Sequence, residues 1–164
     1  ACLSPFNAYL TCLGLETLGI RMERACENAY KLAKWFEAND KLDSVNYPGL
    51  ESSTYHTIAK QQFVNGYGAM VTIRAGSKKK AFSIMNHLQY ALKVSNIGDT
   101  KTLVIHPEST IYSHSSAQEK INAGVYEDLI RISVGIEDIE DLIVDFEQAI
   151  NESNIQYDLA SQIN

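Results

Sequence analysis

Arg131 stands out among the residues that could do chemistry, because it interrupts the apolar stretch 129–135. A guanidinium stays charged at any accessible pH, and burying it among aliphatic side chains is costly unless an anion or a carbonyl group pairs with it. Strand alternation would put Ile130 and Ile132 on one face and Arg131 with Ser133 on the other, away from an apolar helix layer. A carbonyl or a core acid could be the partner, but the alternation favours a bidentate contact with a ligand's carboxylate.

A polar turn, Asn96-Ile97-Gly98-Asp99, is the second candidate. Asn, Gly and Asp all favour turn geometry, so a plain turn is the default interpretation, whereas in a functional turn the amides would be donors to an anion. Lys101 follows it and carries the amine that Schiff-base chemistry needs. A lysine in a polar turn is usually solvated, so we do not expect Lys101 to be catalytic.

The other reactive residue types lack the spacing of a known site. The four histidines show no metal-ligand spacing, and no nucleophile elbow surrounds the serines of the polar loop 107–116. Gly66-Tyr67-Gly68 precedes a strand rather than a helix, which is the wrong context for a phosphate loop. The acids from Glu137 to Asp141 fall in the first turn of an expected helix, where they would complement the helix dipole. We therefore predict no metal site.

The elements that must position these residues follow from local signals. Ser4 before Pro5 predicts a helix start, and Gly14 and Gly19 predict a bend or short break before Arg21-Met22, followed by a second amphipathic helix that ends near Asn39-Asp40. Strands are predicted at 42–47, 69–73, 102–105 and 129–134, and helices at 54–63, 78–92, 118–123 and 137–150, with a frayed end from Asn151. Few short strands without a regular βαβ rhythm predict an α+β fold, with a small, mostly antiparallel sheet and helices packed on one face.

Length and charge limit the class of protein. A chain of 164 residues is long enough for one domain or one lobe of a larger protein, and a net charge of −6 argues against a nucleic-acid partner. Three cysteines without C-x-x-C spacing fit a reducing cytoplasm better than a disulfide framework. No stretch reaches the length of a membrane span, so we expect no membrane partner. The absence of an initiator Met predicts a mature, truncated or excised chain.

Five motifs occur in an order that resembles a known family. They are Ser4-Pro5-Phe6-Asn7-Ala8, Gly14-Leu15-Glu16-Thr17-Leu18, Asn46-Tyr47-Pro48-Gly49-Leu50, Asn96-Ile97-Gly98-Asp99 and Arg131-Ile132-Ser133-Val134-Gly135-Ile136-Glu137-Asp138. Together, from Ser4 to about Ile150, they resemble the Cys/Met-metabolism family of pyridoxal-phosphate enzymes, and within it most closely the O-acetylhomoserine sulfhydrylases. The resemblance implies the C-terminal small domain of a fold-type-I enzyme. Residues 1–40 would then form a helical segment that links to an absent large domain, residues 41–153 would form the α+β domain, and residues 154–164 would be a tail.

What the resemblance implies for function concerns a larger parent enzyme. Arg131 would hold the α-carboxylate of an amino-acid substrate, and Asn96 would assist it. The cofactor lysine, in a Ser-x-x-Lys motif, and the glycine-bearing phosphate site would belong to the absent N-terminal domain. We therefore expect no catalytic and no cofactor-binding residue in this chain, no bound pyridoxal phosphate and no activity of the chain alone. The parent is expected to be a cytoplasmic homotetramer, while the oligomeric state of this piece stays open.

The reaction itself stays open at this point. Many relatives carry Thr-His after the segment 107–110, whereas Ile111-Tyr112 stands here. The first expectation is a sulfhydrylase, which replaces acetate at the γ-carbon with sulfide or a thiol. A methionine γ-lyase or a cystathionine γ-synthase is the alternative within the family. A free-standing α+β module that binds an amino acid through Arg131 and Asn96 is the alternative outside it.

Overall fold

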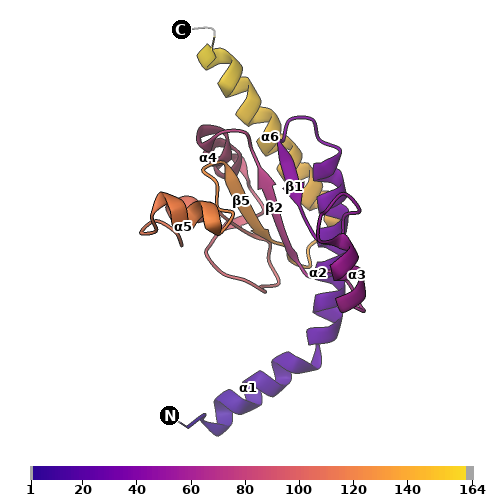
Figure 1. The fold of residues 1–164 in the computed structure, drawn as a ribbon. Coiled ribbons are helices and arrows are strands. Elements are labelled where there is room, and N and C mark those ends of the chain that lie inside the picture. Colours follow the sequence, from indigo (N-terminus) through magenta and orange to yellow (C-terminus); the bar gives the residue numbers. More distant parts are fainter. Residues whose placement is uncertain (1, 162–164) are drawn as a thin grey trace.

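A five-stranded sheet in the order β1-β2-β5-β4-β3 forms the centre of the chain, seen in a computed structural model that describes residues 2–161 (Figure 1). The strands are β1 (Ser44–Asn46), β2 (Met70–Arg74), β3 (Leu92–Lys93), β4 (Leu103–Ile105) and β5 (Leu129–Ser133). Three of the four strand pairs are antiparallel, and only β3 and β4 run parallel. The prediction of a small, mostly antiparallel sheet in an α+β fold is confirmed.

Helices cover one face of this sheet. The helical elements are α1 (Pro5–Glu16), α2 (Leu18–Glu37), α3 (His56–Gln62), α4 (Lys78–His87), the short 3₁₀ helix η1 (Pro107–Ser109), α5 (Ala117–Asn122) and α6 (Ile139–Ser161). Of these, α2, α4 and α6 supply the apolar layer that packs on the sheet. Phe36 of α2 and Phe146 of α6 meet edge to face, with ring centroids 5.1 Å apart, above the fully buried strand residues Ile73, Ile130 and Ile132.

The first two helices begin and end where local chemistry predicts. Ser4 caps α1, since its hydroxyl accepts the Asn7 amide at 3.2 Å, and Pro5 occupies the first turn. The expected break lies at Thr17. No residue of α1 is buried, and the helix extends away from the sheet (Figure 1).

The ends of α4 and α6 and the presence of β3 (Leu92–Lys93) differ from the sequence predictions by more than the usual one or two residues. α4 ends at His87 instead of continuing to residue 92, and the chain then forms β3, which was not predicted. The reason is tertiary: the Asp145 carboxylate of α6 accepts the amides of Gln89, Tyr90 and Ala91 and so stops the helix. α6 continues through Ser161, so the prediction of fraying from Asn151 is wrong for the described residues. Residues 154–161 of the predicted tail are thus helical, and 162–164 lie outside the described residues.

Candidate functional site

Arg131 lies on the sheet face that the helix layer leaves uncovered. Its neighbours Ile130 and Ile132 are both 0% exposed in the core, so the alternation predicted for this strand is confirmed. The strand register places Arg131 beside Thr72 of β2, and Thr72 beside Asn46 of β1. A row of polar residues therefore crosses three strands on the uncovered face.

The guanidinium of Arg131 is poorly satisfied by the protein. Its Nη2 donates to the Asn96 carbonyl at 3.5 Å, a long contact, and its buried Nε has no hydrogen-bond partner among the described residues. Among the side chains of residues 2–154, none forms an ion pair with Arg131. A buried donor without a partner is rare in folded proteins and calls for an explanation.

A cavity of about 540 Å³ opens beside Arg131. Its lining comes from the uncovered face of the sheet and from the segments around α5: Asn46, Tyr55, Thr72, Pro107, Ile111, Tyr112, Ile121, Asn122, Ala123, Gly124, Val125, Leu129 and Arg131. This volume lies in the range of small-molecule sites. Arg131 is the one charged side chain among the described residues that line it.

The predicted turn contacts Arg131, but with its backbone and not with the Asn96 side chain. The Asn96 side chain is exposed, and its Oδ1 accepts the Ile97 amide at 2.9 Å, which closes the turn. It is the Asn96 carbonyl that faces Arg131. Gly98 continues the turn in the left-handed region at φ 81°, and its amide donates to the Ser133 hydroxyl at 3.2 Å. The structure thus brings Asn96 and Arg131 together, although Asn96 does not line the cavity.

Two further lining residues, Asn46 and Thr72, were not found from the sequence. Both face the cavity because the antiparallel register aligns them with Arg131. Asn46 opens one of the five motifs, but a motif does not reveal which residue of another strand lies opposite. Only the pairing of β1, β2 and β5 does so.

The residues that we expected to be structural have structural partners. His106 is 1% exposed, with Nε2 2.7 Å from the Glu127 carbonyl and Nδ1 2.8 Å from the Ser109 hydroxyl. Lys101 is exposed. Within residues 2–154 no group of three or more His, Cys, Asp and Glu side chains is arranged to hold a metal, and none of the described helices is long and apolar enough to cross a membrane.

Glu108 lies between two lysines beside the cavity loop. Its Oε2 accepts Lys78 of α4 at 2.7 Å and its Oε1 accepts Lys120 of α5 at 2.5 Å. These hydrogen bonds, with Lys120 contributing most, lower the pKa of Glu108 to about 2. The ion pairs fasten α5, which flanks the cavity, to the helix layer.

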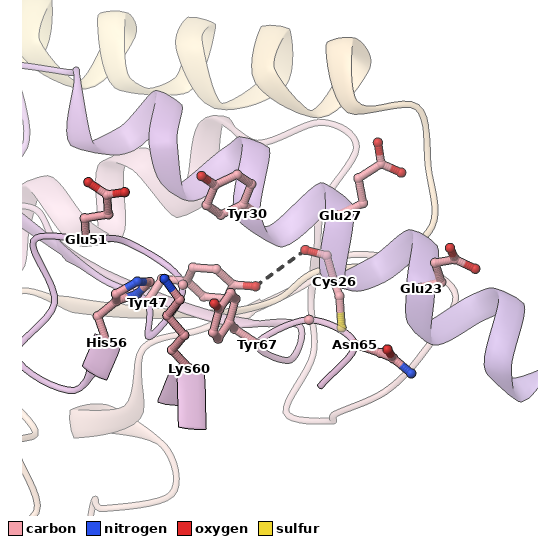
Figure 2. A pocket seen from close by; sticks show the side chains of 12 residues that line it. Glu23, Cys26, Glu27, Tyr30, Tyr47, Glu51, His56, Lys60, Asn65 and Tyr67 are labelled. Atoms are coloured by element: carbon pink, nitrogen blue, oxygen red, sulfur yellow. Dashed lines mark hydrogen bonds between the residues drawn. The ribbon is translucent and has the colours of Figure 1, made fainter. Parts of the chain in front are cut away.

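A second cavity, of about 420 Å³, lies between α2 and α3 (Figure 2). Its polar groups are used to hold the Asn46-Tyr47-Pro48-Gly49-Leu50 motif: the Tyr47 hydroxyl donates to the Gly68 carbonyl at 2.9 Å, and His56 Nδ1 lies 3.0 Å from the Pro48 carbonyl. Burial raises the pKa of the Tyr47 phenol. A Cβ at Gly49 would lie 2.8 Å from the Tyr67 ring, so glycine is required there. We interpret this cavity as a by-product of the motif's packing.

Comparisons with known proteins place this geometry in a family. The homocysteine synthase of Schizosaccharomyces pombe is 47% identical over 148 residues, which cover 90% of this chain and 34% of that protein. The O-acetyl-L-homoserine sulfhydrylase of Leptospira meyeri is 41% identical over 150 residues, with 90% and 34% covered. A crystal structure described as O-acetylhomoserine (thiol)-lyase from Campylobacter jejuni, with N'-pyridoxyl-lysine-5'-monophosphate, superposes with a TM-score of 0.89 at 39% identity, covering 92% of this chain and 36% of that one.

This chain spans about a third of the length of these relatives. The family model for Cys/Met metabolism PLP-dependent enzymes matches residues 1–151. The resemblance drawn from the five motifs is therefore confirmed, and the chain belongs to the Cys/Met metabolism family of PLP-dependent enzymes.

Proposed function

We propose that this chain is the C-terminal, substrate-carboxylate-binding domain of an O-acetylhomoserine sulfhydrylase. The observation that carries the proposal is the buried, unpartnered Nε of Arg131 at the edge of a cavity of ligand size. A carboxylate bound there would accept from two guanidinium nitrogens at once, which fixes both its charge and its orientation. The relatives that act on O-acetylhomoserine by name support the choice of substrate class.

The chain's own part in such an enzyme would be binding and orientation. Arg131 would hold the carboxylate, and Asn96 would assist it by orienting the guanidinium through its backbone carbonyl. Asn46 and Thr72 would contact the remainder of the amino acid along the same row. Because no described lysine lines the cavity, we assign no chemical step to this chain and place the cofactor lysine in the part of the parent that precedes it.

The exposed apolar surface of α1 supports a contact with another part of the parent protein. Its apolar side chains Phe6, Tyr9 and Leu13 are between 49% and 68% exposed, and their spacing of three and four residues puts them on one face of the helix. An exposed apolar face of this kind is normally covered by another protein segment. We propose that the remaining two thirds of the parent enclose α1, and that the chain alone is inactive.

Removal of the guanidinium tests this function in the full-length protein. We expect Arg131→Gln to lower kcat/KM for O-acetyl-L-homoserine with sulfide by about a hundredfold, because a buried charged contact is lost. The carboxamide analogue of the substrate lacks the charge, so its kcat/KM should hardly change, and the absorbance of bound cofactor should stay as in the parent. An Arg131→Gln enzyme that still prefers the carboxylate to the carboxamide would contradict the proposal.

The alternatives are separable in the same set of assays. Turnover of methionine in the absence of O-acetylhomoserine would indicate a γ-lyase, and turnover with cysteine in place of sulfide a cystathionine γ-synthase. The cavity belongs wholly to this chain, which is the one observation that favours a free-standing binding module. Calorimetry of the chain alone with methionine, homoserine and cysteine decides that case, since binding of none of them removes its support.

A further inference from the structure

The turn beside Arg131 has no apolar anchor of its own. Every residue from 92 to 101 is exposed, yet the Asn96 carbonyl must stay next to the guanidinium. Two hydrogen bonds tie the middle of this segment to the end of β5: Gly98 N donates to Ser133 Oγ at 3.2 Å, and Ile136 N donates to the Thr100 carbonyl at 2.9 Å. Single hydrogen bonds between neutral groups each contribute only about 1 kcal/mol, so these two alone hold the segment weakly.

Glu137 supplies the buried anchor of the segment. Both of its carboxylate oxygens bind Thr102, one accepting the backbone amide and the other accepting the hydroxyl at 2.9 Å. Thr102 is 0% exposed, and its hydroxyl oxygen also accepts the Gly135 amide at 2.9 Å. A closed ring of hydrogen bonds thus joins the end of the turn to the end of β5. Charged acceptors make such bonds stronger than neutral ones.

A side chain of the helix layer holds the backbone around Glu137 in place. Asn28 of α2 is 0% exposed, and its Nδ2 donates to the Gly135 carbonyl at 3.1 Å and to the Glu137 carbonyl at 2.9 Å. At Gly135 a Cβ would collide with the Thr100 carbonyl and the Glu137 carboxylate, so the two segments lie as close as backbone allows. The backbone of Glu137 is therefore held in place by α2, while the Glu137 carboxylate holds Thr102 at the end of the turn.

The helix dipole does not explain Glu137. α6 begins at Ile139, and the Glu137 carboxylate faces Thr102 instead of the first amides of that helix. It is Asp138 whose Oδ1 accepts a helical amide, that of Glu140, at 2.9 Å. Our interpretation of this acidic group as helix-terminal charge therefore fails for Glu137.

We propose that Glu137 is a positioning residue for the carboxylate site: by binding Thr102 it holds the 96–102 segment against β5, so that Asn96 lies beside Arg131. This inference rests on the proposed function, in which Arg131 receives the substrate's carboxylate and Asn96 orients Arg131. Glu137 touches neither substrate nor cofactor, and it acts through the turn. A displacement of the turn by about 1 Å would cost the site a large part of its affinity for a carboxylate.

The test uses the full-length, cofactor-loaded protein and compares two equal charge changes. Glu137→Gln removes the anchor, whereas Glu140→Gln removes an exposed acid of α6. We expect Glu137→Gln to raise KM for O-acetyl-L-homoserine about tenfold with kcat nearly unchanged, and to lower the preference for the substrate over its carboxamide by the same factor. Glu140→Gln should leave both quantities at the parental values. Equal behaviour of the two variants would overturn the proposal.

A second pair of variants tests the same proposal if Glu137→Gln fails to fold. Thr102→Val keeps the shape but removes the hydroxyl that links Glu137 to Gly135, and Thr102→Ser restores the hydroxyl. The proposal expects the valine variant to lose carboxylate preference and the serine variant to regain it. A loss of thermal stability in Thr102→Val without a loss of preference would show that the network only stabilises the fold, and the proposal would fail.

The two proposals fail in different ways. If Arg131→Gln leaves the carboxylate preference intact, the proposed function itself is wrong. If Arg131→Gln abolishes the preference while Glu137→Gln and Thr102→Val both keep it, the function stands and only the positioning role is wrong.

Discussion

At the scale of single residues, two arginines of the same sheet differ in whether the protein neutralises their charge. Arg74 of β2 pairs with the buried Asp128 at 2.9 Å, and its guanidinium stacks over the Tyr126 ring at 4.3 Å from the centroid. Its charge is thus satisfied inside the protein, as a structural arginine requires. Arg131, on the neighbouring strand, has neither a carboxylate nor a ring among the described residues. The difference in partners, and not the residue type, is what supports the proposed role of Arg131 in binding a ligand.

Glu108 provides a pH prediction at the same scale. Its pKa in the folded chain is about 2, below the ordinary value of 4.5, because hydrogen bonds from Lys120 and Lys78 hold its charged form. A lowered pKa stabilises the fold at pH above the unfolded value, and this stabilisation is lost as pH falls from about 4.5 to about 2. We therefore expect Glu108→Gln to be less stable than the parent at pH 7 and equally stable near pH 2.

Urea unfolding of both proteins between pH 7 and pH 2 measures this difference. Glu140→Gln is the matched control, since it removes the same charge from an exposed position. A gap between Glu108→Gln and the parent that stays constant down to pH 2 would show that the two lysines do not hold the carboxylate in solution.

At the scale of elements, Asp145 decides how α4 and α6 are joined. Its carboxylate, 4% exposed, accepts three backbone amides at 2.8 to 3.0 Å at the end of α4. In Asp145→Asn the amide group would turn a donor toward these donors, so we expect a loss of about 3 kcal/mol in the free energy of unfolding. Asp141→Asn, on the exposed side of α6, should change it by less than about 0.5 kcal/mol. Chemical denaturation measures both, and similar losses in the two would contradict the assigned role.

An element could be predicted from the sequence where adjacent residues set its boundary, and not where a distant residue such as Asp145 does. The start of α1 depends on Ser4 and Pro5, which are adjacent, so it was predicted correctly. The end of α4 and the two-residue strand β3 depend on Asp145, more than fifty residues away, so the predicted helix was too long. Likewise, the face of Arg131 follows from alternation within one strand, whereas the row with Thr72 needs the register of two.

At the scale of the whole molecule, the chain has two surfaces that its own residues leave uncovered. One is the sheet face with the Arg131 cavity, and the other is α1, which extends away from the body of the chain (Figure 1). The core lies between α2, α4, α6 and the sheet and includes no residue of α1. Stability and the proposed docking to the parent are therefore carried by different parts of the chain, and they can be separated by experiment.

Deletion of residues 2–16 makes this separation testable. Since none of the deleted residues is buried, we expect the free energy of unfolding of the shortened chain to stay within about 1 kcal/mol of the original. Phe146→Ala, in the core, should cost about 3 to 5 kcal/mol in the same assay.

Self-association of the isolated chain gives the complementary readout. The exposed apolar side chains of α1, among them Phe6 and Leu10, should make the chain associate with itself, as large uncovered apolar surfaces do. Sedimentation should then show oligomers for the full chain and a monomer after the deletion. The double substitution Leu10→Gln and Leu13→Gln keeps the helix and should reproduce the effect of the deletion. Oligomers that persist in both variants would assign the association to another surface, and a large loss of stability on deletion would show that α1 packs against the domain in solution.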